Sequence, residues 1–539
     1  MKKLLFRAIL CLFFLSHSTV TPANLPLSGA DGWQLSEASF ASNPNGGSPA
    51  ILHPSRLIDE SESISGPQPV PLLYPSGLEK KRILSTPVIP TYSPRHSFVQ
   101  DRSTGGFTLP SAVLQLQAPA RLKTFQGPVQ RRFFPPDSII AAGPTRVVVA
   151  VNSSVLFYMK SGSQTFSAGL NKFFSALSEN NGTRLFDPKV LFDQYAQRFI
   201  LVVAAIRERD SSSWLFLAVS KTSDPHKAWA LWALDMTLDG TTKTSHWADF
   251  PGLGIDEKAI YLTANMFRFG INRFAYAKLR ILDKSEVSKF GKIGYFDFFK
   301  MKDVTGELTG TLQPAHSFGT TSKEFLVSCS DVGGTKITLW RVSNPLAAEP
   351  SLRKKGVTVS SFRMPPDAQQ KGSKIPLHTL DAGFRANLVF RDGYLFTVHT
   401  IAQDWGAGNV AALRIYQLGT DGRVLQEITY GSDRLSYFYP AIMPDTRGNL
   451  VLVFNRSGQS EFVGIHFTGR KANQPLGKLE NSSALKVSTS SYLALDDSGR
   501  NRFGDYSGIA LEQDDSIWIF GEFALDSGSW ATQIGRVKY

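Results

Sequence analysis

The sequence predicts an all-β fold: a seven-bladed β-propeller preceded by a signal peptide and an irregular N-terminal arm. Three observations lead to this prediction. One pattern of a polar residue, a short strand of small residues, a turn and a β-branched or aromatic run recurs seven times after Asp137. The copies follow one another at steps of about 50 to 67 residues, which suits a unit of several strands. The chain is 42% hydrophobic and 12% aromatic, which is enough for a large strand-rich core.

The first 23 residues have the layout of a secretory signal peptide. Lys2, Lys3 and Arg7 form a basic start, an apolar run follows, and Thr21-Pro22-Ala23 is a small-residue exit. We therefore expect cleavage after Ala23 and a secreted, periplasmic or cell-envelope location in a bacterium. An uncleaved membrane anchor is the alternative. After residue 16 no apolar stretch is long enough for a membrane helix.

Residues 24–107 are rich in proline, serine and glycine, as in SNPNGGSPA and SISGPQPVPLLYPSG. This composition favours an exposed, mostly irregular arm. The propeller is expected over 108–539. Since the chain ends after the third strand of the seventh copy, the missing outer strand should come from the N-terminal side, with 111–117 as the expected segment.

Each copy can be divided into strands. In the third copy FPGLGID is the innermost strand, AIYLTANMF the second and FAYAKLRILDK the third. Glycine and alanine are frequent in the innermost strands, as expected where several sheets converge on an axis with little room.

The polar residues that open the copies should approach one another on one face of the ring. They are Asp137, Asp187, Asp249, His316, Asp381, a tyrosine-proline pair at 439–440, and Asp505. Carboxylates near one axis could hold Ca²⁺ through oxygen ligands, and the metal candidates are Asp137, Asp187, Asp249 and Asp381. The alternative is that these aspartates accept backbone hydrogen bonds and fix turns. No cofactor is required by the sequence.

Departures from the repeat are better candidates for ligand binding than the repeat itself. The candidates are His316, Arg385, Arg502, Asp505, Tyr506, Arg268, Arg273 and Trp247. Carboxylates, arginines and aromatic rings on one face are the side chains of a carbohydrate or small-ligand site. The sequence singles out no catalytic residue.

Composition and motifs exclude several functions. The formal charge is +13, but the basic residues come in short groups, which favours solvated loops over a specific nucleic-acid surface. HExxH, GxSxG, phosphate-binding and dinucleotide motifs are missing. Of the two cysteines, Cys11 leaves with the signal peptide, and Cys329 is expected to be buried.

Four phrases carry a family resemblance: PPDSIIAAGPTRVVVAVN, FDPKVLFDQYAQRFILV, DFPGLGIDEKAIYLTANMF and GDYSGIALEQDDSIWIFGEF. They resemble a poorly characterised group of secreted bacterial β-propeller proteins over about residues 130–539. The segment 330–335, followed by Trp340, also resembles the Asp-box turn of sialidase-type propellers, although its spacing differs and no second copy occurs. The resemblance implies an exported propeller and no particular reaction.

The sequence therefore predicts an exported binding or interaction module whose channel face recognises a glycan or a cell-surface partner. The alternative is a secreted glycoside hydrolase, sialidase-like, that uses the same face. A pair of carboxylates, or a tyrosine with a glutamate, about 5–10 Å apart beside clustered arginines would indicate the hydrolase.

Overall fold

The computed structural model describes residues 32–57, 70–71, 95–103, 118–130 and 133–539. The predicted signal peptide at 1–23 and the segment 111–117 lie outside these residues. No helix in the described part of the chain is long and apolar enough to span a membrane.

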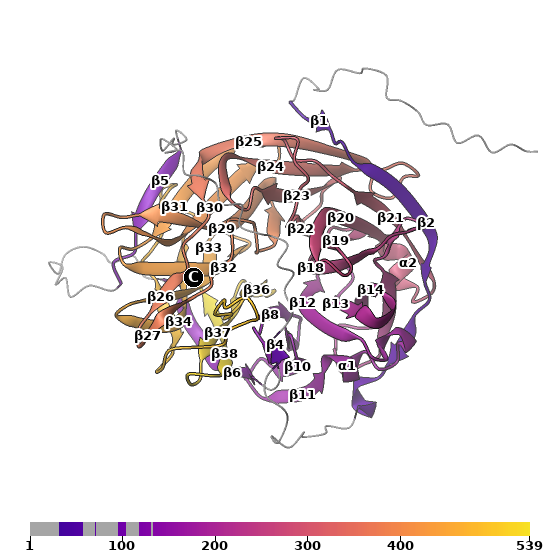
Figure 1. Ribbon diagram of the computed structural model, residues 1–539, viewed down its shortest axis with the longest axis horizontal. Coiled ribbons are helices and arrows are strands. Elements are labelled where there is room, and N and C mark those ends of the chain that lie inside the picture. The colour runs from indigo at the N-terminus through magenta and orange to yellow at the C-terminus, as the bar shows by residue number, and fades with distance from the viewer. Residues whose placement is uncertain (1–31, 58–69, 72–94, 104–117, 131–132) are drawn as a thin grey trace, which may run out of the picture.

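Seven blades of antiparallel strands are arranged as a ring about one axis (Figure 1), so the predicted seven-bladed propeller is confirmed. Parallel contacts between inner strands join blades 3, 4 and 5 into one sheet. From the axis outward, blade 1 consists of β8 (Ile139–Ala142), β9 (Arg146–Val151), β10 (Ser154–Met159) and β11 (Gln164–Gly169). Blade 2 consists of β12 (Arg184–Asp193), β13 (Arg198–Arg207), β14 (Ser212–Ser220) and β15 (Trp229–Asp235). Blade 3 consists of β18 (His246–Ile255), β19 (Ala259–Arg268), β20 (Arg273–Asp283) and β21 (Ile293–Phe299).

The remaining blades repeat this order. Blade 4 consists of β22 (Gln313–Phe318), β23 (Lys323–Cys329), β24 (Gly333–Ser343) and β25 (Ser351–Arg363). Blade 5 consists of β28 (Leu388–Arg391), β29 (Tyr394–Asp404), β30 (Asn409–Gly419) and β31 (Val424–Gly431). Blade 6 consists of β32 (Leu435–Pro444), β33 (Leu450–Gly458), β34 (Glu461–Arg470) and β35 (Ser483–Val487). Blade 7 consists of β36 (Gly508–Leu511), β37 (Ile517–Ala524), β38 (Trp530–Lys538) and β6 (Ala120–Val129).

Short elements fill the connections. The helices are α1 (Leu170–Phe173) and α2 (Lys284–Ser288). Three two-stranded ladders pair β16 (Leu238–Asp239) with β17 (Thr242–Lys243), β26 (Ala368–Gln370) with β27 (Ser373–Leu377), and β4 (Val70–Pro71) with β7 (Phe133–Phe134).

The ring is closed by an N-terminal strand. β6 pairs with β38 in antiparallel register, with Phe125 opposite Ile534. The prediction that the outer strand of blade 7 comes from the N-terminal side is confirmed. The strand itself is 120–129, a little later in the chain than the expected segment. Closure leaves β38 with a partner on both sides.

The arm contains more strand than its composition predicts. β1 (Gln34–Leu35), β2 (Ser39–Gly47) and β3 (Ala50–Leu52) pair with the outer strands of blades 4, 3 and 2, and β5 (His96–Gln100) with that of blade 5. Figure 1 shows β2 lying along the outer rim. The expected irregular arm is therefore wrong for these residues. An unpaired blade edge offers backbone donors and acceptors that can hold a polar segment as a strand.

The repeated aspartates mark a bulge at the start of the inner strand. A residue other than glycine has positive φ at this point in six blades: Asp137, Asp187, Phe250, Thr311, Leu380 and Tyr439, with φ between 48° and 65°. The ladders shift register at the same place in blades 2, 3 and 6. A bulge turns the chain into the inner strand and aims the neighbouring side chains toward the axis.

His316 is not the fourth copy's equivalent of these aspartates, so this prediction was wrong. In the parallel contacts between inner strands His316 pairs with Ile255 and Val389, well beyond the bulge. Thr311 holds the bulge position in blade 4.

The core lies between neighbouring blades. One cluster joins Leu215 and Trp232 of blade 2 to Leu253 and Leu262 of blade 3. The inner strands approach so closely that a Cβ on Gly254 would lie 2.4 Å from the carbonyl oxygen of Ala315 in the next blade. Glycine is therefore needed at this position.

Candidate functional site

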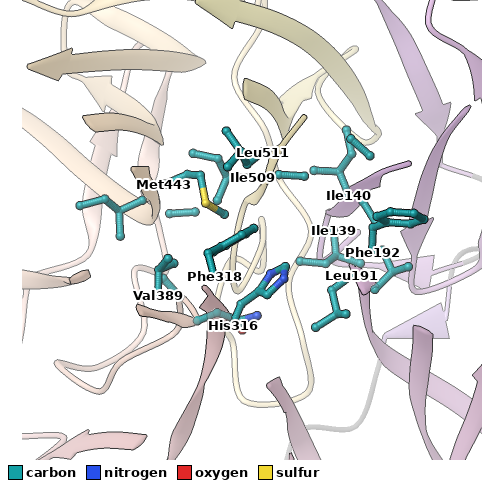
Figure 2. A pocket seen from close by; sticks show the side chains of 18 of the residues that line it. Ile139, Ile140, Leu191, Phe192, His316, Phe318, Val389, Met443, Ile509 and Leu511 are labelled. Carbon is teal, nitrogen blue, oxygen red and sulfur yellow. The ribbon is translucent and has the colours of Figure 1, made fainter. Parts of the chain in front are cut away.

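A cavity of about 200 Å³ lies among the inner strands. Figure 2 shows that most of its lining side chains are apolar. They come from β8, β12, β22, β28, β32 and β36, and include Ile139, Ile140, Leu191, Phe192, Phe318, Val389, Met443, Ile509 and Leu511. The cavity thus has the apolar walls that are typical of a small-molecule site.

One end of the cavity is cationic. Lys189, Arg385 and Tyr506 line it near the bulges at the start of the inner strands. We call these three residues the cationic end. Arg391 and Glu512 line the cavity toward the other ends of the same strands. One end therefore presents two cationic side chains and an aromatic ring to a ligand, and the other presents a guanidinium group and a carboxylate.

Lys189 is 2% exposed, and its ammonium nitrogen lies over two aromatic rings. The nitrogen is 2.9 Å from the centroid of the Tyr506 ring and 4.9 Å from that of Phe250. No hydrogen bond or ion pair among the described residues involves Lys189. Burial lowers the pKa of Lys189 to about 7, although Asp187 raises it. A neutral amine is thus accessible near neutral pH.

Arg385 stands beside Lys189. Its guanidinium carbon is 4.7 Å from the centroid of the Phe250 ring, which Lys189 also contacts. Nη2 donates to Asp381 Oδ2 at 2.5 Å, while Nε is buried without a hydrogen-bond partner. The guanidinium can therefore donate further hydrogen bonds to an anionic group.

Five buried carboxyl groups lie near the cationic end: Asp137, Asp187, Asp249, Asp505 and Glu522. Burial raises the pKa of each of them. Asp249 reaches about 7, and the charge of Asp505 raises the pKa of Asp137 and Asp187 further. The inner ends of the blades thus bring these acids close together, and burial holds the pKa of each above its ordinary value.

The four aspartates of this group differ in their partners. Asp137 accepts from Asn152 Nδ2 at 2.5 Å, Asp249 accepts from the Phe250 N–H at 3.0 Å, and Asp505 pairs with Arg502. Asp187 is 1% exposed, and neither of its carboxylate oxygens has a hydrogen-bond partner. A buried carboxyl group without partners is costly, so Asp187 is the member of the four with unused hydrogen-bonding capacity.

The bulges are also linked from blade to blade. The Asp187 N–H donates to Asn152 Oδ1 at 2.7 Å, and the Thr311 N–H donates to Asn265 Oδ1 at 2.7 Å. In each case an asparagine at the end of a second strand holds the bulge of the next blade. These asparagines therefore stabilise the backbone that surrounds the cavity, and they are not ligand-binding candidates.

Within the part of the chain that the structure describes, no three His, Cys, Asp or Glu side chains are arranged to hold a metal ion. Asp381 is committed to Arg385 and to the Gly383 N–H. The calcium site stays a prediction of the sequence.

Three of the other candidates lie away from the cavity. Arg268 and Arg273 are exposed and face each other at the tip of the β19–β20 hairpin. Trp247 is buried in the core, with its ring 5.4 Å from Phe267. Their side chains do not line the cavity.

His316 and Arg502 are placed differently. His316 lines the cavity, where burial lowers its pKa to about 3, and its Nε2 lies 3.0 Å from Gln194 Oε1. It is therefore a neutral side chain at physiological pH. Arg502 is buried and paired with Asp505, so it neutralises the acids behind the cationic end.

Lys189 was missed by the sequence analysis. It stands directly after the Asp187-Pro188 anchor, in an otherwise apolar inner strand (KVLF). A single lysine in such a strand was the available signal. Burying an unpaired charge costs free energy, so a lysine on an inner strand is expected to have a specific role.

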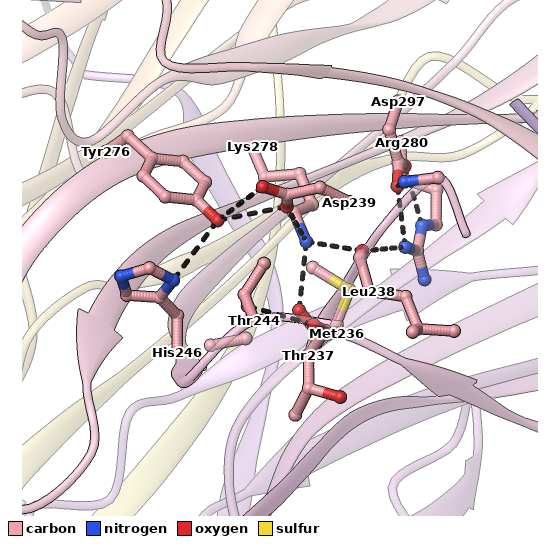
Figure 3. A network of polar contacts seen from close by, with 12 residues as sticks. Met236, Thr237, Leu238, Asp239, Thr244, His246, Tyr276, Lys278, Arg280 and Asp297 are labelled. Atoms are coloured by element: carbon pink, nitrogen blue, oxygen red, sulfur yellow. Dashed lines mark hydrogen bonds and ion pairs between the residues drawn. The ribbon is translucent and has the colours of Figure 1, made fainter. Parts of the chain in front are cut away.

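A second buried polar cluster lies in blade 3 (Figure 3). Lys278 Nζ is 2.8 Å from Asp239 Oδ1 and donates to the carbonyl oxygens of Met236 and Leu238. Tyr276 donates to Asp239 as well, at 2.8 Å from Oδ2. The donors and acceptors of this cluster are paired with one another and with the 236–239 backbone, so its role is to anchor that connection.

No family model and no curated protein matches the sequence. Similar solved structures include the sialidase of Trypanosoma rangeli, at 10% identity and a TM-score of 0.35; the match covers 71% of this chain and 57% of the sialidase chain. An exo-1,5-α-L-arabinanase from a bovine ruminal metagenomic library matches at 9% and 0.30, covering 64% of this chain and 96% of the enzyme. A xylan β-1,4-xylosidase from Bacillus halodurans C-125 matches at 11% and 0.28, covering 75% and 94%.

The chain thus spans less than three fifths of that sialidase. Likenesses of this strength carry no argument about function. The function must be argued from the cavity and its residues.

Proposed function

We propose that this propeller is a binding module whose central cavity takes a small organic anion with an apolar body. The observation that carries the proposal is the cationic end of a cavity whose walls are mostly apolar. Arg385 would hold the anionic group through its unused Nε, and the walls would bury the rest of the ligand. At about 200 Å³ the cavity is smaller than the sites of drug-sized molecules, so the ligand is small.

The glycan that the sequence predicted as ligand is a special case of this proposal, provided that the sugar carries an anionic group. A sugar with a carboxylate could use Arg385. Most of its hydroxyl groups, however, would face walls such as Leu191, Val389 and Ile509, which offer no side-chain hydrogen bonds, while polar lining residues such as Gln194, Asn387 and Thr446 could pair with only some of them. Burying unpaired hydroxyl groups is unfavourable, so the walls favour an apolar body over a sugar ring.

The arrangement of carboxylates favours binding over hydrolysis. Glycoside hydrolysis needs two carboxyl groups that flank the scissile bond or, in a sialidase-like site, a tyrosine with a supporting acid. Tyr506 lines the cavity, but its hydroxyl group donates to the Pro188 carbonyl oxygen at 2.9 Å. Among the described residues that line the cavity, Glu512 is the one carboxylate, and it accepts from Trp518 Nε1 at 2.8 Å and from Ser516 Oγ at 3.1 Å. The buried aspartates do not line the cavity. Export, which rests on residues 1–23, completes the proposal.

Calorimetric titration of the chain from residue 24 tests it. We expect 4-methylpentanoate to bind more tightly than its neutral amide, glucose or N-acetylneuraminic acid. Arg385→Gln should weaken carboxylate binding about tenfold, because a charge-assisted hydrogen bond contributes ~1.5 kcal/mol. Arg391→Gln, at the opposite end of the same cavity, is the matched control and should change affinity less than about twofold. Equal affinity for acid and amide would contradict the proposal, and tighter binding of the acidic sugar would restore the glycan.

A further inference from the structure

We propose that Lys189 forms a reversible imine with a carbonyl group of the bound ligand, and that the ligand class is a small 2-oxo acid with an apolar side chain. The inference rests on the proposed function, since the ligand must reach the cavity. It assigns to Lys189 a covalent chemistry that goes beyond binding.

Lys189 lines the cationic end of the cavity, and no hydrogen bond or ion pair of the described residues engages its ammonium nitrogen. The nitrogen lies over the faces of Tyr506 and Phe250. The other buried lysines of the described residues are engaged. Lys278 pairs with Asp239, Lys284 pairs with Asp193 at 2.6 Å, and Lys354 donates to two backbone carbonyl oxygens.

Lys189 lies in an apolar setting beside a second cation. An amine attacks a carbonyl only when it is unprotonated, and an apolar setting near another cation favours that form. Arg385 supplies the neighbouring positive charge. The pKa of about 7 for Lys189 agrees with this geometry.

The cationic end places a guanidinium group and an amine over one aromatic ring. Arg385 and Lys189 lie over the same Phe250 ring, one as an anion donor and the other as an amine. A carboxylate held by Arg385 would bring the adjacent carbonyl carbon toward Lys189, and this adjacency is the structure of a 2-oxo acid. The apolar walls would then receive the side chain.

The reaction balances without a further reactant. Lys189 Nζ attacks the carbonyl carbon, a C–N bond forms, and the carbonyl oxygen takes up a proton to give a carbinolamine. Loss of the hydroxyl group as water then gives the imine, so that amine plus ketone yields imine plus water. Asp187, buried and without hydrogen-bond partners, is the nearby carboxyl with capacity to exchange a proton, and it acts on Lys189 as a positioning residue.

Trapping by reduction tests the inference. The chain from residue 24 is incubated with 4-methyl-2-oxopentanoate and sodium cyanoborohydride, and the adduct is located by peptide mass spectrometry. We expect one main adduct, at Lys189, and protection by excess 4-methylpentanoate, which has no ketone. Lys189→Arg should abolish the adduct, and Lys189→Met repeats the test if the arginine variant does not fold.

Two further variants separate chemistry from structure. Arg385→Gln should slow trapping of the 2-oxo acid about tenfold while leaving trapping of 3-methylbutanal, which has no carboxylate, within about twofold. The groups that face the amine are Asp187, Asp137, Asp505 and Arg385. Asp187→Asn removes a charge that favours the protonated amine, so the midpoint of trapping against pH should move to lower pH, an effect that a merely structural Asp187 would not have.

The outcomes are distinct. An adduct at Lys189 that 4-methylpentanoate suppresses supports the inference. Binding of 4-methylpentanoate without an adduct at Lys189 overturns it and leaves the proposed function standing. An adduct spread over surface lysines also overturns it, and failure of both binding and trapping removes the proposed function as well.

Discussion

The ring of Tyr506 lies 2.9 Å from the ammonium nitrogen of Lys189, and the Tyr506 hydroxyl donates to the carbonyl oxygen of Pro188 at 2.9 Å. One side chain from blade 7 thus fixes both the backbone before Lys189 and the end of the Lys189 side chain. Because blades 7 and 2 are separated by blade 1 around the ring, this contact joins two blades that are not neighbours. The position of the amine therefore depends on an intact ring.

Substitutions at Tyr506 should separate these two contacts. Tyr506→Phe removes the hydrogen bond to Pro188 and keeps the ring, so we expect a loss of about 1 kcal/mol of unfolding free energy in urea. Tyr506→Leu also removes the ring and should cost about 3 kcal/mol, by analogy with other losses of a buried aromatic ring. Equal losses in the two variants would show that the ring contact with Lys189 does not contribute.

The contribution of Asp249 to stability should fall as the pH rises from about 4 to about 7. Asp249 in the folded protein holds its proton up to a pKa of about 7, whereas the unfolded chain releases it near the ordinary pKa of 3.8. The folded state therefore binds more protons in this window, and each such group contributes a slope of up to about 1.4 kcal/mol per pH unit.

Asp249→Asn checks this dependence, because it removes one of the titrating groups. Urea unfolding at pH 4, 5, 6 and 7 should give a flatter profile for the variant than for the parent chain. Asp404→Asn, at an exposed hairpin tip, is a control that should leave the slope unchanged. A difference in unfolding free energy between the parent chain and Asp249→Asn that does not fall as the pH rises would contradict the expected direction.

The buried ion pair of blade 3 should be costly to break from one side. Lys278→Met leaves the Asp239 carboxylate buried without its cation, and we expect a loss of about 3–5 kcal/mol of unfolding free energy. Lys278→Met combined with Asp239→Leu should recover a large part of that loss, because both charges are then gone. A double-mutant cycle in urea measures the coupling, and additive losses would count against a direct interaction.

The hydrogen bonds of Asn152, which link blades 1 and 2, should contribute more to the free energy of unfolding than a single side-chain hydrogen bond does. Asn152→Ala removes the acceptor of the Asp187 N–H and the donor to Asp137 and Pro135, so we expect a loss of about 2–3 kcal/mol. Asn409→Ala, at an exposed site, is the matched control and should lie within about 0.5 kcal/mol of the parent chain. Thermal unfolding of the three proteins in parallel gives the comparison.

The blades were predictable because their strands have a strong sequence pattern. Runs such as RVVVAVN at 146–152 are buried on both faces and must be β-branched or small. The arm was not predictable in the same way. The segment SFASNPNGG at 39–47 is polar, and it becomes a strand because the edge of blade 3 supplies its hydrogen bonds. Such pairing leaves no hydrophobic periodicity in the sequence.

The candidate site was predicted in part for a similar reason. The repeated aspartates located the bulges and hence the axis, because a bulge needs a residue that tolerates positive φ and aspartate does so readily. In the fourth copy the residue with positive φ is Thr311. Threonine does not mark a bulge in the sequence, so His316 was wrongly matched to the aspartates of the other copies. Lys189 is recognised as a site residue only when Tyr506, far away in sequence, is placed over it.

Closure by β6 means that the ring can be completed only after the last strand of the chain, β38, has been synthesised. The Trp530 N–H donates to the Gln130 side chain across 400 positions of the chain. The strand that completes the last blade is synthesised before the first blade, and it cannot pair until the last blade exists. Before that step the edge of β38 is unpaired and can bind a strand of another chain. The lifetime of the open ring, more than the stability of the closed one, therefore decides how much of the protein aggregates during folding.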